Sequence, residues 1–289
     1  MTDPMQDEPD FDLLRTPDEA LPEPRPPRPV GVWIAVIALI IAAAIAAYVF
    51  GRRRAPATTT PPPSAATAPS STQPLGGPAE PIALPPLDQS DQLVRDLVRK
   101  LSSHPEVTAW LATNGLIRNF AVVVTNIADG STPAAHLQSL RPSASFQVTN
   151  RGGELYIDPR SYQRYDGFAS AIASIDPADA ARLYSTLKPR IEDAHRDLGF
   201  PNTSFDRPLE RAIVLLLKTP VVDGPIAVTK KGGVGYAYAD QDLESLTAAQ
   251  KQLLRTGPAN ERTIQASLRK IAGALGIPAE RLPAQVRQD

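Results

Sequence analysis

One uninterrupted apolar run constrains this chain more than any other feature. It reaches from Val30 to Phe50, is 21 residues long, and contains neither a charged residue nor a proline. At about 1.5 Å per residue, a helix of that length spans roughly 31 Å, which matches the hydrocarbon thickness of a bilayer. Trp33 and Tyr48 lie near its ends, where aromatic side chains favour the headgroup boundary. The run predicts a single transmembrane helix over residues 30–50.

Two other interpretations of this run are a buried core helix and a cleaved signal peptide. Against the core helix, Arg28 and the cluster Arg52 to Arg54 flank the run, where they can reach lipid phosphates. Against the signal peptide, the apolar region of such a peptide is about 7–15 residues long and follows a short basic start. Here an acidic segment of 29 residues precedes a longer run. Both alternatives are therefore less consistent with the pattern than a membrane span.

The orientation of the span rests on opposing signals. Three arginines lie near each end, so the positive-inside rule is tied, and the cluster Arg52 to Arg54 leans toward a cytoplasmic C-terminal side. The long spacer that follows favours a domain held away from the membrane. We therefore expect a single-pass protein of the bacterial inner membrane, with its C-terminal domain in the periplasm. The helix also carries a face of small residues, which would permit a homodimer: Gly31, Ala35, Ala38, Ala42 and Ala46.

The segments on either side of the span have the composition of disordered chain. Residues 1–29 hold eight acids and three arginines, a net charge of −5, and form an acidic tail. Residues 51–87 hold ten prolines among alanine, threonine and serine, which predicts a tether with polyproline II character. Of the 31 prolines, 18 fall in residues 1–87, so only the later part has an ordinary globular composition. We predict a folded domain over residues 88–277 and a short tail over 278–289.

The folded domain shows mainly helical periodicity, so its predicted fold class is mainly α. Asp176–Pro177 pairs a capping acid with a proline at the first helical position, and Gly199 provides a left-handed stop for the same helix. Pro189 lies inside it and predicts a kink or a division. Thr247 and Gln250 match a capping box. The segment 116–127 is consistent with a buried helix, although its three successive valines leave a strand as an alternative.

Two short segments alternate between apolar and polar residues instead. The first, 146–158, places Asn150 to Gly153 between its alternating halves, and the second, 226–239, places glycines between Val228 and Tyr236. Turn-forming residues between alternating runs are typical of β-hairpins. We therefore expect a compact multi-helix domain that carries one or two small β-hairpins.

Composition and motifs exclude several kinds of function. The domain from residue 88 onward has 24 basic and 22 acidic residues, which is too nearly neutral for a nucleic-acid binder. No cysteine is present, and the three histidines share no metal-ligand spacing, so we expect no metal and no cofactor. His195 to Leu198 match a kinase catalytic loop in letters, but the glycine-rich loop and the D-F-G sequence of kinases are missing. The sequence predicts no catalytic residues.

One cluster of residues is a candidate for binding. Arginine and tyrosine are enriched at the energetic centres of interfaces, and they crowd a predicted helix start just after the first hairpin: Arg160, Tyr162, Arg164, Tyr165 and Asp166. A local salt-bridged cluster that packs on the core is the alternative explanation.

Three blocks of the C-terminal part resemble a known bacterial family. They are the segments 164–205, 215–228 and 236–261, which include the sequence QKQLLRTGP. They are similar to the bacterial domain-of-unknown-function 3014 family, and the likeness covers most of residues 87–277. The resemblance implies an N-terminal membrane helix, a low-complexity spacer and an envelope domain. It implies no activity and no catalytic residues, and residues 230–235 depart from the family pattern.

We therefore expect a membrane-anchored module of the bacterial cell envelope that is not an enzyme. Its partners would be the lipid bilayer, through residues 30–50, and an envelope protein or a cell-wall component. The alternative is an enzyme of unfamiliar, hydrolase-like type, whose catalytic residues are separated in the sequence and come together only in the fold.

Overall fold

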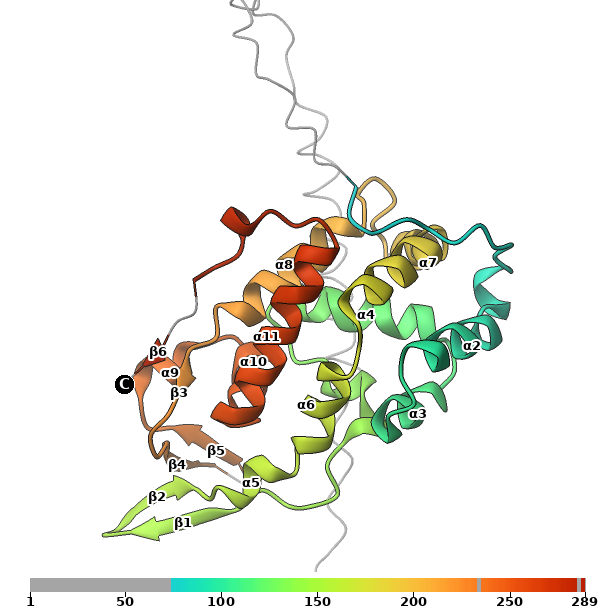
Figure 1. The fold of residues 1–289 in the computed structure, drawn as a ribbon. Helices are drawn as coiled ribbons and strands as arrows, with labels where there is room; N and C mark the ends of the chain where they lie inside the picture. Colours follow the sequence, from blue (N-terminus) through green and yellow to red (C-terminus); the bar gives the residue numbers. More distant parts are fainter. Residues whose placement is uncertain (1–73, 233–234, 285–286, 289) are drawn as a thin grey trace, which may run out of the picture. The chain divides into compact units, whose positions relative to one another are not determined.

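The computed structural model describes residues 74–232, 235–284 and 287–288. The predicted acidic tail, the membrane helix with its small-residue face, and residues 51–73 of the predicted tether lie outside these described residues. The described part is a mainly helical domain with a small four-stranded antiparallel sheet at one end (Figure 1). The prediction of a mainly α domain is thereby confirmed.

Ten α-helices are present in the described residues: α2 (Asp91–Leu101), α3 (Pro105–Leu111), α4 (Leu116–Ala128), α5 (Arg160–Gln163), α6 (Asp166–Ala173), α7 (Pro177–Asp197), α8 (Asp206–Leu217), α9 (Gln241–Ser245), α10 (Ala248–Leu254) and α11 (Pro258–Ala274). The strands within the same residues are β1 (Val148–Arg151), β2 (Glu154–Ile157), β3 (Val221–Val222), β4 (Ala227–Lys231), β5 (Gly235–Tyr238) and β6 (Arg287–Gln288). Segment 116–127 is therefore a helix and not a strand.

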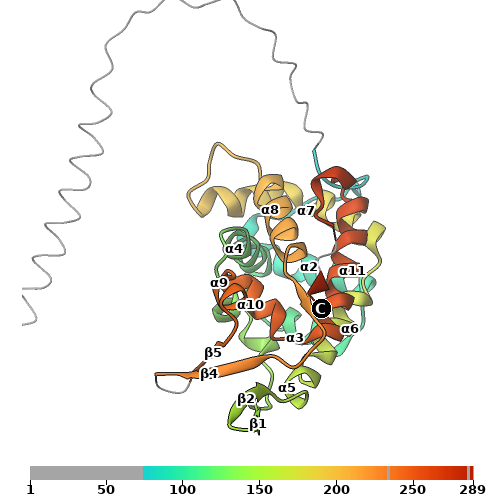
Figure 2. The same ribbon diagram turned by 90° about the vertical axis from the view of Figure 1, so that its left-hand side faces the viewer.

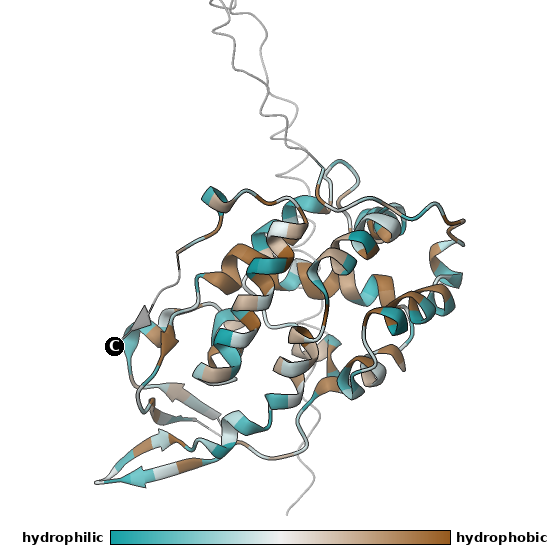
Figure 3. Cartoon of the chain, viewed as in Figure 1, coloured by the Kyte–Doolittle hydropathy of each residue, from teal (hydrophilic) through white to brown (hydrophobic). Residues whose placement is uncertain are grey.

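The main core lies between α2, α4, α7, α8 and α11. Helix α4 packs against α7 and α8, and α11 packs against α6, α7 and α8. Leu116, Phe205 and Leu217 are fully buried in this core. Helices of this core bury apolar side chains, such as Val94 and Leu97 of α2 and Leu209 and Ile213 of α8. Figure 3 shows hydrophobic and hydrophilic residues interspersed along α11. Among the described residues no single helix could cross a membrane; α3 and α4 reach that length and hydropathy only as a pair that bends by 109°.

Local capping signals define the helix ends as predicted. The Asp176 carboxylate accepts hydrogen bonds from the N–H groups of Ala178 and Asp179, and Pro177 begins α7. After α7, Gly199 has a φ of 96°, which is the left-handed conformation that glycine tolerates best. Thr247 and Gln250 form the predicted capping box of α10.

Helix α7 continues through Pro189 without a division, so that part of the prediction is wrong. A proline inside a helix removes one backbone hydrogen bond and weakens the helix locally. Here Leu187 and Ile191 lie on either side of the proline in the main core, with exposed fractions of 6% and 3%. Their burial holds both halves of α7 on the same neighbours.

Both predicted hairpins are present, and they join into one sheet. Strand β1 pairs with β2 and β4 pairs with β5, all antiparallel. Strand β2 also pairs with β4, where Leu155 lies opposite Val228, so the strand order is β1-β2-β4-β5. Figure 2 shows both hairpins again at one end of the helical body. A separate parallel pair joins β3 and β6.

The two faces of the sheet differ in character. Alternate residues of the four strands point to one face, where Ile157, Val228 and Tyr238 form a second core with Leu254 of α10. The opposite face carries residues such as Arg151 and Tyr156, and Tyr156 donates a hydrogen bond to Glu154. The apolar face therefore lies toward the helices. Side chains at the edge of this face are available to line a binding site.

The part of the predicted tether that the structure describes lies against α7. The Gly77 N–H donates to the Ala181 carbonyl at 3.2 Å, and Leu75 is buried in the main core with 5% exposure. Gly76 has a φ of 121°, and a Cβ at this position would lie 1.9 Å from Ser185 Oγ. Only glycine allows so close an approach. Residues 75–77, which belong to the predicted tether, are therefore packed against the domain.

Candidate binding site

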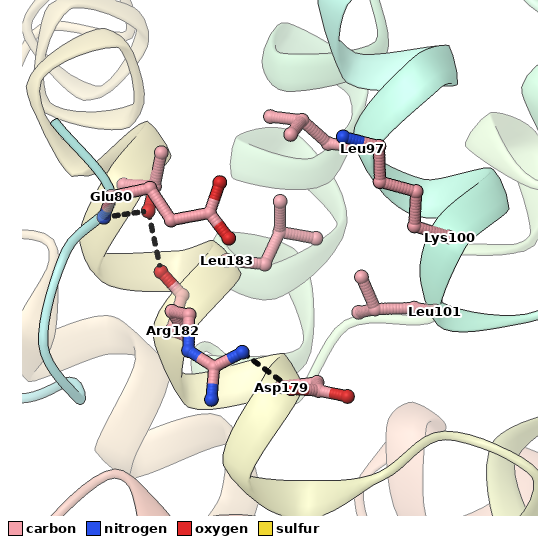
Figure 4. A pocket seen from close by; sticks show the side chains of 8 residues that line it. Glu80, Leu97, Lys100, Leu101, Asp179, Arg182 and Leu183 are labelled. Atoms are coloured by element: carbon pink, nitrogen blue, oxygen red, sulfur yellow. Dashed lines mark hydrogen bonds and ion pairs between the residues drawn. The ribbon is translucent and has the colours of Figure 1, made fainter. Parts of the chain in front are cut away.

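Among the hollows on the surface of the described residues, two are candidates for a site. The first, of about 200 Å³, lies between α2, α7 and the segment that holds Glu80 (Figure 4). Arg182 forms an ion pair with Asp179 at 2.8 Å, and Lys100 lies on the α2 side. Two acids and two bases line this hollow, so their formal charges cancel.

The second hollow, of about 290 Å³, lies between the inner face of the sheet, the turn that joins α5 to α6, and α10. Two of the five predicted binding residues, Arg164 and Tyr165, line it. Both come from the α5–α6 turn, and the short helix α5 connects this turn to β2, so the turn lies beside the sheet. We refer to this second hollow as the arginine–tyrosine pocket.

The Arg164 guanidinium is held in place by neutral groups. Its Nε donates to the Ser161 carbonyl at 2.8 Å, and its Nη1 donates to the Ala144 carbonyl at 3.1 Å. The guanidinium carbon also lies 5.0 Å from the centre of the Tyr165 ring and 5.6 Å from that of Phe146. Such cation–π contacts orient the charge without neutralising it. Arg164 is thus fixed in position with its positive charge uncompensated.

Aromatic rings form much of the pocket wall. Phe146 and Tyr236 lie with their ring centres 5.5 Å apart in a tilted arrangement. Tyr165 is 9% exposed, and its hydroxyl oxygen receives a hydrogen bond of 3.4 Å from Gln252 Nε2. Tyr238 closes the inner side, next to the second core. These rings have restricted freedom before any ligand arrives, which lowers the entropy lost on binding.

Arg255 provides a second positive charge. It directly follows α10 and lines the pocket, partly exposed to solvent. Its guanidinium has no hydrogen-bond or ion-pair partner among the residues that the structure describes. Burial raises the pKa of the Tyr238 phenol, and the nearby charge of Arg255 acts in the opposite direction. The guanidinium therefore lies close to the inner wall of the pocket.

The other three predicted residues do not line this pocket. Arg160 forms an ion pair with Asp158 at 2.7 Å, and this contact holds the pKa of the Asp158 carboxyl well below its usual range. The Arg160 side chain is 70% exposed. The Asp158 carboxylate also accepts a hydrogen bond from the Arg160 N–H at the start of α5. Arg160 therefore stabilises the local structure between β2 and α5 through its contacts with Asp158.

Tyr162 and Asp166 contact the chain near the start of α11. Tyr162 packs so closely on Gly257 that a Cβ there would lie 2.3 Å from its ring, and burial raises the pKa of its phenol to about 12. The Asp166 carboxylate accepts a hydrogen bond of 2.8 Å from Asn260 Nδ2. Tyr162 and Asp166 thus make local packing contacts, as in the alternative explanation of the cluster that the sequence left open.

A buried carboxyl group lies behind the sheet in the first turn of α11. Glu261 is 0% exposed, and neither of its carboxylate oxygens has a hydrogen-bond partner within the described chain. Burial raises the pKa of this carboxyl to about 8, with a smaller opposing effect from Arg262. At neutral pH the group is largely protonated, so it does not neutralise the arginines of the pocket.

Local sequence signals for the rest of the pocket are weak. Phe146 and Tyr236 belong to the alternating patterns that predict hairpins, and Gln252 and Arg255 lie in or beside a stretch with ordinary helical spacing. About 90 residues separate Arg164 from Arg255, and only the fold brings them to one pocket. Within the described ranges no three His, Asp or Glu side chains are arranged to hold a metal ion.

Comparison with known proteins gives one match. No curated protein and no solved structure matches the chain. A family model described as "Protein of unknown function (DUF3014)" matches residues 116–272, which is 157 of the 289 residues. The matched region runs from α4 to α11 and includes both hairpins and the arginine–tyrosine pocket. The resemblance seen in the sequence is thereby confirmed, and the chain belongs to the DUF3014 family.

Proposed function

We propose that this protein is a membrane-anchored module of the bacterial envelope that binds a protein or cell-wall partner through the arginine–tyrosine pocket. The observation that carries the proposal is the lining of the pocket. Arg164 and Arg255 lie among Phe146, Tyr165 and Tyr236, and arginine and aromatic residues are those that supply most binding energy at interfaces. Hydrogen bonds to backbone carbonyls hold Arg164 in place before binding.

The chemistry of the lining favours binding over catalysis. Hydrolytic catalysis generally needs a nucleophile or a general base within reach of the substrate. The described residues that line the pocket include no Asp, Glu, His or Ser. Tyrosine is also a possible nucleophile, but an activated one has a lowered pKa or an adjacent base, whereas burial raises the pKa of the Tyr238 phenol. Glu261 has a raised pKa, but its complete burial keeps it from contact with a substrate in this conformation.

We also propose a membrane anchor and a periplasmic position for the domain. Residues 30–50 would span the bilayer and place the domain in the periplasm, with residues 51–73 as the tether. At about 3.1 Å per residue, these 23 residues would reach roughly 71 Å if fully extended in polyproline II geometry. That reach would let the pocket meet partners well away from the membrane surface.

Site-specific photocrosslinking in cells tests the proposal. Tyr236 is replaced in the full-length protein by p-benzoylphenylalanine, another large aromatic residue, so that the crosslinker lies in the pocket. The matched control carries the same replacement at Tyr156, which lies in β2 on the opposite face of the same sheet. We expect a discrete crosslinked product from position 236 only. The absence of any product at 236, or equal products at both positions, would refute the pocket as the binding site.

A further inference from the structure

The arginine–tyrosine pocket holds two positive charges that no carboxylate in the described structure offsets. Arg164 donates only to two backbone carbonyls and to the Tyr165 hydroxyl, and Arg255 has no partner among the described residues. Two acids, Glu244 and Glu261, lie close enough for their charges to act on Tyr238 at the inner wall of the pocket. Glu244 accepts hydrogen bonds from Lys251 and from the Tyr238 N–H, and burial of Glu261 raises the pKa of its carboxyl to about 8. The pocket is therefore positively charged.

Such an arrangement favours a carboxylate ligand. A partly buried cation loses hydration, and a carboxylate restores the lost interaction through charge-assisted hydrogen bonds, which are about twice as strong as neutral ones. Arginine presents its donors as a planar fork that fits the two carboxylate oxygens. The surrounding rings exclude water and so strengthen this attraction.

The neighbouring strand offers backbone groups to a peptide. Strand β5 is the last strand of the sheet among the described residues, and it pairs on one side only, with β4. Backbone groups alternate along such a strand: the Ala239 N–H, just after β5, donates to the carbonyl of Ala227 in β4, whereas the Tyr238 N–H points outward to Glu244. By this alternation the N–H and C=O of Tyr236 also point outward, beside the pocket.

We infer that the arginine–tyrosine pocket receives an acidic peptide segment of a partner protein. A carboxylate of the peptide pairs with Arg255 and Arg164, an apolar side chain packs on the rings of Phe146 and Tyr236, and the peptide backbone bonds to Tyr236 at the free edge of β5. The volume of about 290 Å³ suits one or two residues of such a segment. This inference rests on the proposed function and specifies its partner.

Fluorescence anisotropy with two labelled peptides tests the ligand class. The probe is a rhodamine-labelled peptide Gly-Asp-Phe-Glu-Phe with a free C-terminus, and its comparison is Gly-Asn-Phe-Gln-Phe amide, which has the same shape without the carboxylates. The protein is the full chain in a mild uncharged detergent. We expect the acidic peptide to bind at least tenfold more tightly than the neutral one and to weaken as salt is raised.

Two variants assign the binding to the pocket. Arg255→Ala should weaken the acidic peptide at least tenfold, because it removes one of the two positive charges of the pocket. The substitution breaks no hydrogen bond or ion pair of the Arg255 guanidinium that the described fold shows. Arg151→Ala, on the outer face of the sheet, is the matched control and should leave the affinity unchanged. Circular dichroism checks that both variants remain folded. Equal affinity for the two peptides, or an unchanged affinity in Arg255→Ala, would overturn the inference.

Competition by other anions separates the sources of negative charge. Inorganic phosphate and vesicles of phosphatidylglycerol should displace the acidic peptide only weakly. If either displaces the peptide fully at micromolar concentration, the pocket binds phosphate groups and the peptide inference is wrong. If neither peptide binds while position 236 still crosslinks in cells, the ligand class is wrong and the proposed function stands. If the acidic peptide binds but no crosslink forms in cells, the proposed function fails.

Discussion

The buried carboxyl of Glu261 should make the stability of the domain depend on pH. Glu261 lies in the first turn of α11, is 0% exposed, and has no hydrogen-bond partner for either oxygen in the described residues. An ionised carboxylate in such surroundings loses its hydration without compensation. Burial therefore raises its pKa from 4.5 to about 8 in the folded protein.

The direction of the effect follows from proton linkage. Below pH 4.5 the group is protonated in both the folded and the unfolded chain, so it adds no pH dependence to the free energy of unfolding. Above pH 4.5 the unfolded chain releases the proton while the folded chain keeps it, so unfolding becomes more favourable with rising pH. The loss continues until the folded group ionises near pH 8.

The magnitude is large for one residue. Each pH unit between the two pKa values corresponds to about 1.4 kcal/mol, so the interval from pH 5 to pH 8 removes about 4 kcal/mol. Glu261→Gln keeps the shape of the side chain and cannot ionise. We expect the variant to be similar to the wild type at pH 5 and more stable by about 3–4 kcal/mol at pH 8.

Urea unfolding of the full chain in mild detergent, followed by circular dichroism at pH 5, 6, 7 and 8, measures this difference. The matched control is Glu280→Gln, because Glu280 is an exposed glutamate outside the core. The slope of unfolding free energy against pH should flatten in Glu261→Gln and stay unchanged in Glu280→Gln. A wild-type slope in Glu261→Gln would show that the buried carboxyl is not the source of the pH dependence.

Three further predictions follow from other parts of the fold. His195 is 2% exposed between the rings of Phe200 and Phe205, and burial lowers its pKa, so its contribution to stability is present above pH 6.5 and declines as the pH falls. In the same urea assay, His195→Gln should therefore lose less stability than the wild type between pH 7 and pH 5. Leu75→Ala should reduce the free energy of unfolding by about 2–4 kcal/mol, since Leu75 fills the main core, whereas Leu198→Ala, at a side chain 38% exposed, should change it by less than about 1 kcal/mol. Similar values for the two leucine variants would mean that the segment before α2 is not part of the cooperative fold. For the membrane orientation, alkaline phosphatase fused to the C-terminus should be active and a fluorescent protein that matures only in the cytoplasm should stay dark; the reverse pattern would place the domain in the cytoplasm.

The sequence by itself determined the features that depend on neighbouring residues. The cap at Asp176, the capping box of Thr247 and Gln250, and the stop at Gly199 each involve side chains and backbone within four residues. Both hairpins were predictable for the same reason, because a turn and the alternation beside it lie within about a dozen residues. The family was also recognisable, since its blocks are continuous in sequence.

The tertiary structure decided whatever joins distant segments. The pairing of Leu155 with Val228 unites the two hairpins, and the close approach of Gly76 to Ser185 holds part of the predicted tether against α7. Neither contact leaves a local pattern, because each depends on which apolar faces meet when the core closes. The same holds for the pocket. The residue types around Arg164 predict a binding role for it. Its position in one pocket with Arg255 depends on the β2–β4 contact and on the position of α10, and both are properties of tertiary packing.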